Sequence, residues 1–203
     1  PPPFFITQTP PTDTSPPQYA ARLRCVSAPP LTLLARGVCG GMRAFAGTDT
    51  VATPHPGEMA RLTGTPVAEI QADRIGTART FAASQGVVTL LKGAPSLVAD
   101  PDGGLLVSTT EGTSALAVAG MGDVLTGAIA SYLAQGARPA VACGLALHVT
   151  GRAAASGGLG VSLIPSDVVE GIPAVVRQLG GGDGAAATDL PFPFVTFDQA
   201  SPG

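Results

Sequence analysis

The sequence predicts an α/β protein whose mostly parallel sheet is covered by helices on both faces. Three observations support this prediction. The run 87–91 (Val-Val-Thr-Leu-Leu) is nearly all apolar and rich in β-branched residues, which is typical of a strand buried on both faces. Segments with apolar residues at helical spacing stand before and after this run. Turns rich in glycine and proline separate the segments, so strands and helices alternate along the chain.

The composition is that of a globular chain with one domain and tails. The chain has 203 residues, of which 45% are apolar and 12% charged, and its formal net charge is −3. The lack of a basic excess argues against nucleic acid as a partner. No apolar run reaches the roughly 20 residues needed to cross a membrane. The three cysteines have neither metal-ligand spacing nor the pattern of a disulfide framework. We therefore expect a cytoplasmic protein without a metal site built from its own side chains.

Residues 1–45 are expected to form a proline-rich tail, disordered or extended. Repeated proline pairs interrupt any regular ladder of hydrogen bonds there. Order is predicted to begin at Val51, and the domain is assigned to residues 46–180. Residues 181–203 are expected to form a second, flexible tail.

Inside the domain, apolar periodicity predicts the elements, and turn residues bound them. Gly86 ends one helix, and Pro139 opens another at its first turn. The sequence DPDGG at 100–104 is a hairpin turn between two short strands. Ser166 is expected to cap the last helix. The predicted elements are a strand ending at 53, strands at 87–91, 96–99 and 105–108, and helices from 58, over 67–84, 124–134, 139–155 and 167–179.

The stretch 117–127 (AVAGMGDVLTG) is the strongest candidate for a functional site. Its glycines, Gly120 and Gly122, allow a tight turn and leave room for a ligand against the main chain. The helix that follows presents unpaired N–H groups and the positive end of its dipole, which suit a phosphate. Asp123 in its first turn is either a helix cap or a base that takes a proton from a hydroxyl. Gly-x-Gly-Asp is too short to decide between these interpretations.

Two further motifs stand at predicted strand ends, where ligands bind in α/β sheets. The first reads TPHPGE and begins at Thr53; its His55 is either a ligand-contacting residue or only a turn residue. Glu58 is interpreted as favouring the helix N-terminus and is left out of the site. The second reads KGAPS; its Lys92 is either a ligand-contacting residue or a solvated lysine at a strand end. Gly93 suits a close approach of the backbone to a ligand.

Taken together, the three stretches resemble the ADP- or ATP-dependent NAD(P)H-hydrate dehydratases. They match the family's TPHPGE, LKG and aGxGDVLxG motifs in order and spacing, and the similarity extends over about 51–179. The resemblance implies a ribokinase-like fold. It also implies that ADP or ATP phosphorylates the hydroxyl of (S)-NAD(P)H hydrate, after which phosphate leaves and NAD(P)H is restored, with AMP or ADP as the other product. The implied partners are NAD(P)H hydrate and an adenine nucleotide, and the implied cofactor is Mg²⁺ on the nucleotide phosphates.

The resemblance also implies roles for individual residues. Asp123 is the expected catalytic residue and binds the substrate together with His55. Members of the family are often homo-oligomers, so the resemblance is compatible with a homo-oligomer. The nucleotide is expected to bind to Lys92, Gly93, Ala94, Pro95, Ser96 and Gly122.

The chain departs from the family pattern in two places. Residues 108–114 keep Gly112 but lack the asparagines of the family's N-x-x-G-N stretch, and residues 37–47 replace an Asp-Ala-Asp strand end. Family members carry several βα units before TPHPGE. The chain is therefore expected to be a fragment, or to carry front residues from a disrupted reading frame, and to leave strand edges unpaired.

Two alternative functions remain open at this point. One is a small-alcohol kinase of the ribokinase superfamily, which would release a phosphorylated product. The other is a truncated, non-catalytic remnant that binds a nucleotide without turnover.

Overall fold

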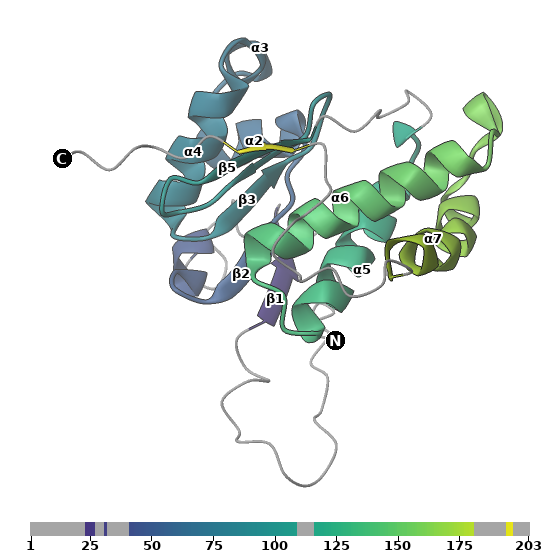
Figure 1. The fold of residues 1–203 in the computed structure, drawn as a ribbon. Coiled ribbons are helices and arrows are strands. Elements are labelled where there is room, and N and C mark those ends of the chain that lie inside the picture. The colour runs from purple at the N-terminus through teal and green to yellow at the C-terminus, as the bar shows by residue number, and fades with distance from the viewer. Residues whose placement is uncertain (1–22, 27–30, 32–40, 109–115, 181–193, 197–203) are drawn as a thin grey trace, which may run out of the picture.

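The computed structural model describes residues 23–26, 31, 41–108, 116–180 and 194–196. Within them, one sheet has the strand order β1-β2-β3-β4-β5-β6 (Figure 1). The strands are β1 (Leu23–Val26), β2 (Asp49–Ala52), β3 (Val88–Leu91), β4 (Leu97–Ala99), β5 (Leu105–Ser108) and β6 (Phe194–Thr196). The helices are η2 (Met42–Phe45), α2 (Pro56–Thr63), α3 (Val67–Ala72), α4 (Arg74–Gln85), α5 (Met121–Ala134), α6 (Pro139–Ser156), η4 (Gly160–Ser162) and α7 (Pro165–Gly180).

The sheet is mixed rather than mostly parallel. β1, β2 and β3 pair in parallel, whereas β3–β4, β4–β5 and β5–β6 pair antiparallel. The α/β class is confirmed, but the expected excess of parallel pairs is not found. The reason is the length of the connections, because the short turns that link β3, β4 and β5 permit only antiparallel neighbours. The hairpin at 100–104 forms as predicted, with the Asp100 N–H donating to the Gly104 carbonyl at 2.8 Å.

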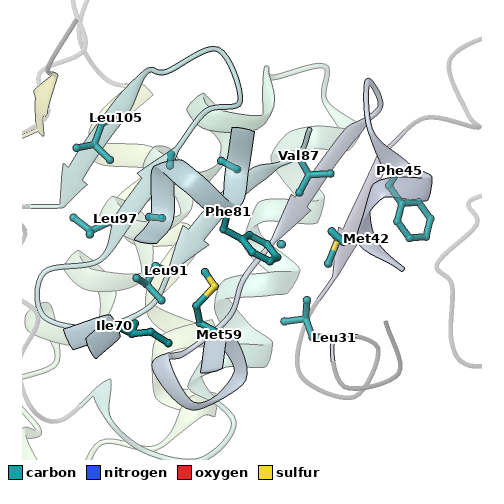
Figure 2. Close-up of a cluster of buried hydrophobic side chains, with 14 residues drawn as sticks. Leu31, Met42, Phe45, Met59, Ile70, Phe81, Val87, Leu91, Leu97 and Leu105 are labelled. Atoms are coloured by element: carbon teal, nitrogen blue, oxygen red, sulfur yellow. The ribbon is translucent and has the colours of Figure 1, made fainter. Parts of the chain in front are cut away.

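Alternate residues of the central strands enter two separate cores, one on each face of the sheet. Leu91 of β3 joins a cluster with side chains of η2, α2, α3 and α4, part of which Figure 2 shows. Leu90 joins the opposite cluster, which α5 and α6 cover. Successive strand residues point to opposite faces, so a strand with both faces buried needs the continuous apolar run that the sequence shows.

The last described helix, α7, packs mainly on α6 and α5. Val168 and Val175 of α7 are buried with Val149 of α6 and Met121 of α5. The chain thus has a third cluster, outside the two sheet faces. Among the described residues, none of the helices is both long and apolar enough to span a bilayer.

Two predicted helix boundaries change in the structure. The helix expected over 67–84 is two helices, because Asp73 leaves helical geometry (φ −136°, ψ 74°) and its carboxylate accepts from the Gly76 N–H at 2.8 Å as the cap of α4. The last helix begins at Pro165, so Ser166 lies inside it and is not its cap. The carboxylate of Asp167 instead accepts from the Ile164 N–H at 2.9 Å.

The structure also corrects both predicted tail boundaries. β1 lies within the expected tail of residues 1–45, and it covers the edge of β2 that would otherwise be open. Leu31, Met42 and Phe45 are buried in the first core, so ordered packing starts before residue 46. At the other end, β6 lies within 181–203 and pairs with β5. Apart from residues 23–26, 31, 41–45 and 194–196, both predicted tails lie outside the described ranges.

Shortening Leu90 to alanine is expected to destabilise the fold strongly. Leu90 is fully buried in β3, and removing a buried leucine side chain costs about 2–5 kcal/mol of unfolding free energy. Urea unfolding followed by circular dichroism measures this loss. Val161→Ala is the matched control, because Val161 is 96% exposed. A comparable loss in both variants would contradict the assignment of Leu90 to the core.

Candidate functional site

The loops after β2 and β3 meet at one edge of the sheet. The Lys92 N–H donates to the Pro54 carbonyl at 2.8 Å, which ties the two loops together. The N-terminus of α5 lies at the same place, because a Cβ built on Gly122 would be 3.4 Å from Lys92 Nζ. The three sequence motifs therefore converge at the carboxyl ends of two parallel strands, as the sequence predicts for a ligand site.

The first turn of α5 has two features of a ligand site. Its main-chain N–H groups suit an anion, and it also carries the exposed carboxylate of Asp123. Gly120 is the N-cap residue, with φ 91° in the left-handed region that favours glycine. Asp123 stands three residues later, and its side chain is exposed. Its carboxylate forms no hydrogen bond or ion pair with any described residue, and the N-cap has no side-chain bond. Asp123 is thus not the N-cap residue, and its carboxylate is available to a ligand.

Glu58 joins the first two motifs, although sequence reasoning left it out of the site. Its side chain is only 2% exposed, and its Oε2 lies 3.5 Å from Lys92 Nζ. The same oxygen accepts from the His55 N–H at 2.7 Å. One buried carboxylate therefore holds both the lysine and the turn that carries the histidine. A glutamate three residues after a helix N-cap is a known capping signature, which could have indicated the bond to His55. The pairing with Lys92 has no local signal.

His55 caps α2 with its own ring. Its Nδ1 accepts from the Gly57 N–H at 3.0 Å and from the Glu58 N–H at 3.2 Å. The neutral ring then carries its proton on Nε2, which lies 3.6 Å from Glu58 Oε2. The side chain is half exposed. His55 therefore has the structural role that the sequence left open, and its ring edge remains accessible from the solvent.

Acidification is expected to destabilise the protein through His55. Burial lowers the pKa of His55 below its usual 6.5; the Glu58 carboxylate opposes this shift, and the Lys92 ammonium adds to it. His55 therefore binds a proton less readily in the folded state than in the unfolded chain. The unfolding free energy therefore falls as the pH drops below about 6.5. His55→Asn keeps a capping acceptor but does not titrate, so it should lose less stability on acidification.

Melting temperatures at about pH 7.5 and about pH 5.5 check this expectation, because they bracket the ordinary titration of histidine. Burial also lowers the pKa of His148, but this contribution is common to both proteins and cancels in the comparison. An equal fall in the melting temperature of the wild type and of His55→Asn would contradict the role assigned to His55.

Residues Lys92–Ser96 connect β3 to β4. They are here called the nucleotide turn, after the role that the family resemblance implies for them. The Ser96 hydroxyl donates to the Gly93 carbonyl at 3.0 Å and closes the turn. The guanidinium of Arg74 lies against Gly93, where a Cβ would be 2.4 Å from Nη2. Gly93 therefore makes room for a side chain of the protein, and the expected approach of a ligand is not needed to explain the glycine. Arg74 is the second residue that sequence reasoning missed.

The end of β5 lies beside the nucleotide turn. Ser108, at the end of β5, is buried, and its N–H donates to the Ser96 carbonyl at 2.9 Å. Residues 109–115, which stand where the family has its asparagine stretch, lie outside the described residues. The described residues contain no group of three or more histidine, cysteine or acidic side chains that could hold a metal ion.

Comparison with solved structures defines the class of protein. A ribokinase-like superfamily protein from Enterococcus faecalis superposes with a TM-score of 0.64 at 22% identity, covering 79% of this chain and 54% of its own. At that identity the likeness shows the fold alone. The chain thus has a ribokinase-like α/β fold, in which a glycine turn, a lysine and an exposed carboxylate lie near one sheet edge.

The family is shown by sequence. The sequence model of the NAD(P)H-hydrate dehydratases matches residues 42–173, and the chain belongs to this family. A bifunctional NAD(P)H-hydrate repair enzyme of Moorella thermoacetica is 44% identical over 132 residues, 64% of this chain and 25% of the enzyme. The ADP-dependent (S)-NAD(P)H-hydrate dehydratase of Neisseria meningitidis is 51% identical over 86 residues, 42% of this chain and 29% of the enzyme. The membership implied by the three motifs is confirmed.

A solved relative agrees with this assignment. The ADP/ATP-dependent NAD(P)H-hydrate dehydratase of Bacillus subtilis, co-crystallised with ATP and Mg²⁺, is 35% identical with a TM-score of 0.61. The alignment covers 64% of this chain and 47% of the Bacillus protein. The chain therefore spans about half of this solved relative, and about a quarter of the two curated relatives.

Proposed function

We propose that the chain acts in the repair of NAD(P)H hydrate. The reaction is the dehydration of (S)-NAD(P)H hydrate to NAD(P)H, driven by ADP or ATP, with release of AMP or ADP and of phosphate. One observation carries this proposal: Lys92 Nζ stands against Gly122 in the first turn of α5, one residue before the exposed Asp123. A cation, the free N–H groups of a helix and an unpaired carboxylate are the groups needed to transfer a phosphoryl group to a hydroxyl.

In the proposed reaction, Asp123 accepts the proton of the substrate hydroxyl. The hydroxyl oxygen bonds to the terminal phosphorus of the nucleotide, and the bond from that phosphorus to the bridging oxygen breaks. The nucleotide leaves with one phosphate fewer. Cleavage of the carbon–oxygen bond then releases inorganic phosphate, and loss of a proton from the neighbouring ring carbon restores the double bond. The protein contributes mainly position and charge, as in phosphoryl transfer generally.

Two parts of the chain would hold the nucleotide phosphates. The first turn of α5 offers main-chain N–H groups and the positive end of the helix dipole. The nucleotide turn adds Lys92, which is partly buried at 21% exposure and held in place by Glu58. A fixed ammonium beside helix N–H groups can bind the charge that spreads over the transferred phosphoryl group.

The donor set also suits Mg²⁺ carried by the nucleotide. Mg²⁺ usually binds to phosphate oxygens with one or two carboxylates and keeps several waters. Asp123 is the exposed carboxylate of the site, whereas Glu58 is buried and already paired. Such an ion would be held mainly by the phosphate oxygens and water, and it would neutralise charge on the phosphates when bound. The proposed substrate contact of His55 is through Nε2, because Nδ1 is used in the cap.

The test is recovery of reduced nicotinamide from chemically prepared NADH hydrate. The chain is incubated with the hydrate, Mg²⁺ and either ADP or ATP, and the absorbance of NADH is followed together with released phosphate. We expect NADH and phosphate to appear in equal amounts and to depend on the nucleotide. Phosphorylation of a small alcohol without phosphate release would instead indicate a kinase. Binding of ADP without either product would show a nucleotide-binding chain without turnover.

A further inference from the structure

The guanidinium group of Arg74 donates hydrogen bonds to three main-chain carbonyls in and next to the nucleotide turn. Arg74 is the first residue of α4, whereas the turn lies after β3. Its Nη2 donates to the carbonyl oxygens of Leu91 at 3.4 Å, Lys92 at 3.3 Å and Pro95 at 2.9 Å. Charge-assisted hydrogen bonds of this kind are stronger than neutral ones. One side chain thus binds both the start and the end of the turn.

Two further neighbours, Gln71 and Gly93, contact the guanidinium. Its Nη1 donates to Gln71 Oε1 at 2.7 Å. A Cβ on Gly93 would lie 2.4 Å from Nη2 and 2.8 Å from Cζ, so only glycine leaves room for the group. The Nε of Arg74 is buried and has no hydrogen-bond partner among the described residues, so the group is held through its two terminal nitrogens. A planar guanidinium fixed at both terminal nitrogens can define the orientation of the carbonyls that it binds.

These carbonyls control the rest of the turn through peptide geometry. In a trans peptide, the carbonyl and the following N–H point in opposite directions. Because the Leu91 and Lys92 carbonyls face Arg74, the next N–H groups point away from it. The Lys92 N–H donates to the Pro54 carbonyl, and the Gly93 N–H donates to Ser96 Oγ at 3.3 Å. The bonds to Arg74 therefore set the peptide planes from which the Lys92 side chain projects toward α5.

We propose that Arg74 is a positioning residue for nucleotide binding. It fixes the carbonyl face of the nucleotide turn, and it thereby holds Lys92 and Ser96 where a nucleoside diphosphate or triphosphate would lie. The inference rests on the proposed function, because that function makes this turn the nucleotide site. Arg74 acts through the turn and need not touch the ligand. Its loss should weaken nucleotide binding, because the free turn must be ordered again at each binding event.

The experiment compares Arg74→Ala with Arg79→Ala. Arg79 lies on the same helix, has a buried Nε as well, and forms no hydrogen bond with the nucleotide turn. ADP affinity is measured by calorimetry, and amide hydrogen exchange of residues 92–97 is measured without ligand. For Arg74→Ala we expect the Kd for ADP to rise about tenfold or more, with faster exchange in the turn. The KM for the hydrate should stay within about twofold of the wild-type value, because Arg74 is not proposed to contribute to binding of that substrate. Arg79→Ala should match the wild type in each measurement.

Two additions keep the test decisive if Arg74→Ala folds poorly. Gly93→Ala pushes the guanidinium aside but keeps its charge, so it should also weaken ADP binding. Guanidinium chloride at low, non-denaturing concentration should restore part of the ADP affinity of Arg74→Ala, which a general loss of stability would not allow. Unchanged exchange in the turn, or ADP affinity equal to that of Arg79→Ala, would overturn the inference.

Failure of the proposed function gives a different result. If the wild type binds ADP but restores no NADH, the proposed activity is wrong, while the ADP affinities still decide the role of Arg74. If the wild type binds neither ADP nor ATP, the nucleotide site itself is refuted, and the inference fails with it.

Discussion

Asp123→Asn is expected to abolish most NADH recovery while leaving the protein folded. Asparagine has the shape of aspartate but cannot accept the hydroxyl proton at neutral pH. Loss of a general base typically lowers the rate by about 10²–10⁴-fold. Nucleotide binding should be kept or strengthened, because a negative charge is removed beside the phosphates. Steady-state kinetics with NADH hydrate and ADP, together with calorimetric titration of ADP, measure both effects.

Glu69→Gln is the matched control for Asp123→Asn. Glu69 is an exposed acidic residue in the first turn of α3, three residues after the N-cap, as Asp123 is in α5. Both substitutions remove a favourable charge near a helix N-terminus, which is worth about 0.3–1 kcal/mol. Only Asp123→Asn should affect turnover. A variant Asp123→Asn with near wild-type kcat would refute Asp123 as the base.

Glu58→Gln is expected to reduce kcat/KM for the nucleotide by about 10–100-fold, which is about 1.4–2.8 kcal/mol of transition-state stabilisation. Glutamine can still accept the His55 N–H, so the cap of α2 should remain. It carries no charge, so Lys92 loses the carboxylate that lies 3.5 Å from its Nζ. The lysine should then sample other positions and bind the phosphates less effectively. Initial rates at varied ADP concentration measure this change.

Glu58→Ala separates the charge of Glu58 from its capping role. Alanine removes the acceptor of the His55 N–H as well as the charge, and loss of a cap costs about 0.5–2 kcal/mol. Thermal unfolding should therefore show Glu58→Ala to be less stable than Glu58→Gln, while both have low kcat/KM. If Glu58→Gln retained the wild-type KM for ADP, the pairing with Lys92 would have no part in nucleotide binding.

Much of the candidate site could be predicted from short stretches of sequence. Glycines at 120 and 122 before an apolar helix indicate a turn at which the backbone is accessible. A buried strand followed at once by Lys92 indicates a polar group at a strand end. The convergence of these motifs follows from a general property of α/β sheets, in which the carboxyl ends of parallel strands lie at one edge. The structure brings Lys92 and Gly122 together as that property requires.

Other features depended on residues that are distant in sequence. Glu58 has the local pattern of a capping glutamate, and nothing near it indicates that its carboxylate also meets Lys92. Arg74 follows a cap in a polar segment, and its three carbonyl partners lie 17 to 21 residues away. From the sequence, Gly93 suits the close approach of a ligand, but in the structure the guanidinium of Arg74 occupies that space.

Features set by local sequence and features set by tertiary contacts differ in their physical origin. Turn residues, caps and apolar periodicity act over a few neighbouring residues, so the sequence alone determined most elements of the domain, the α/β class and the three loops at the strand ends. The mixed pairing of the sheet, the addition of β1 and β6, and the partners of Glu58 and Arg74 depend on strand order and register. Only the tertiary structure decided these features, because order and register are set by packing between segments that no local pattern connects.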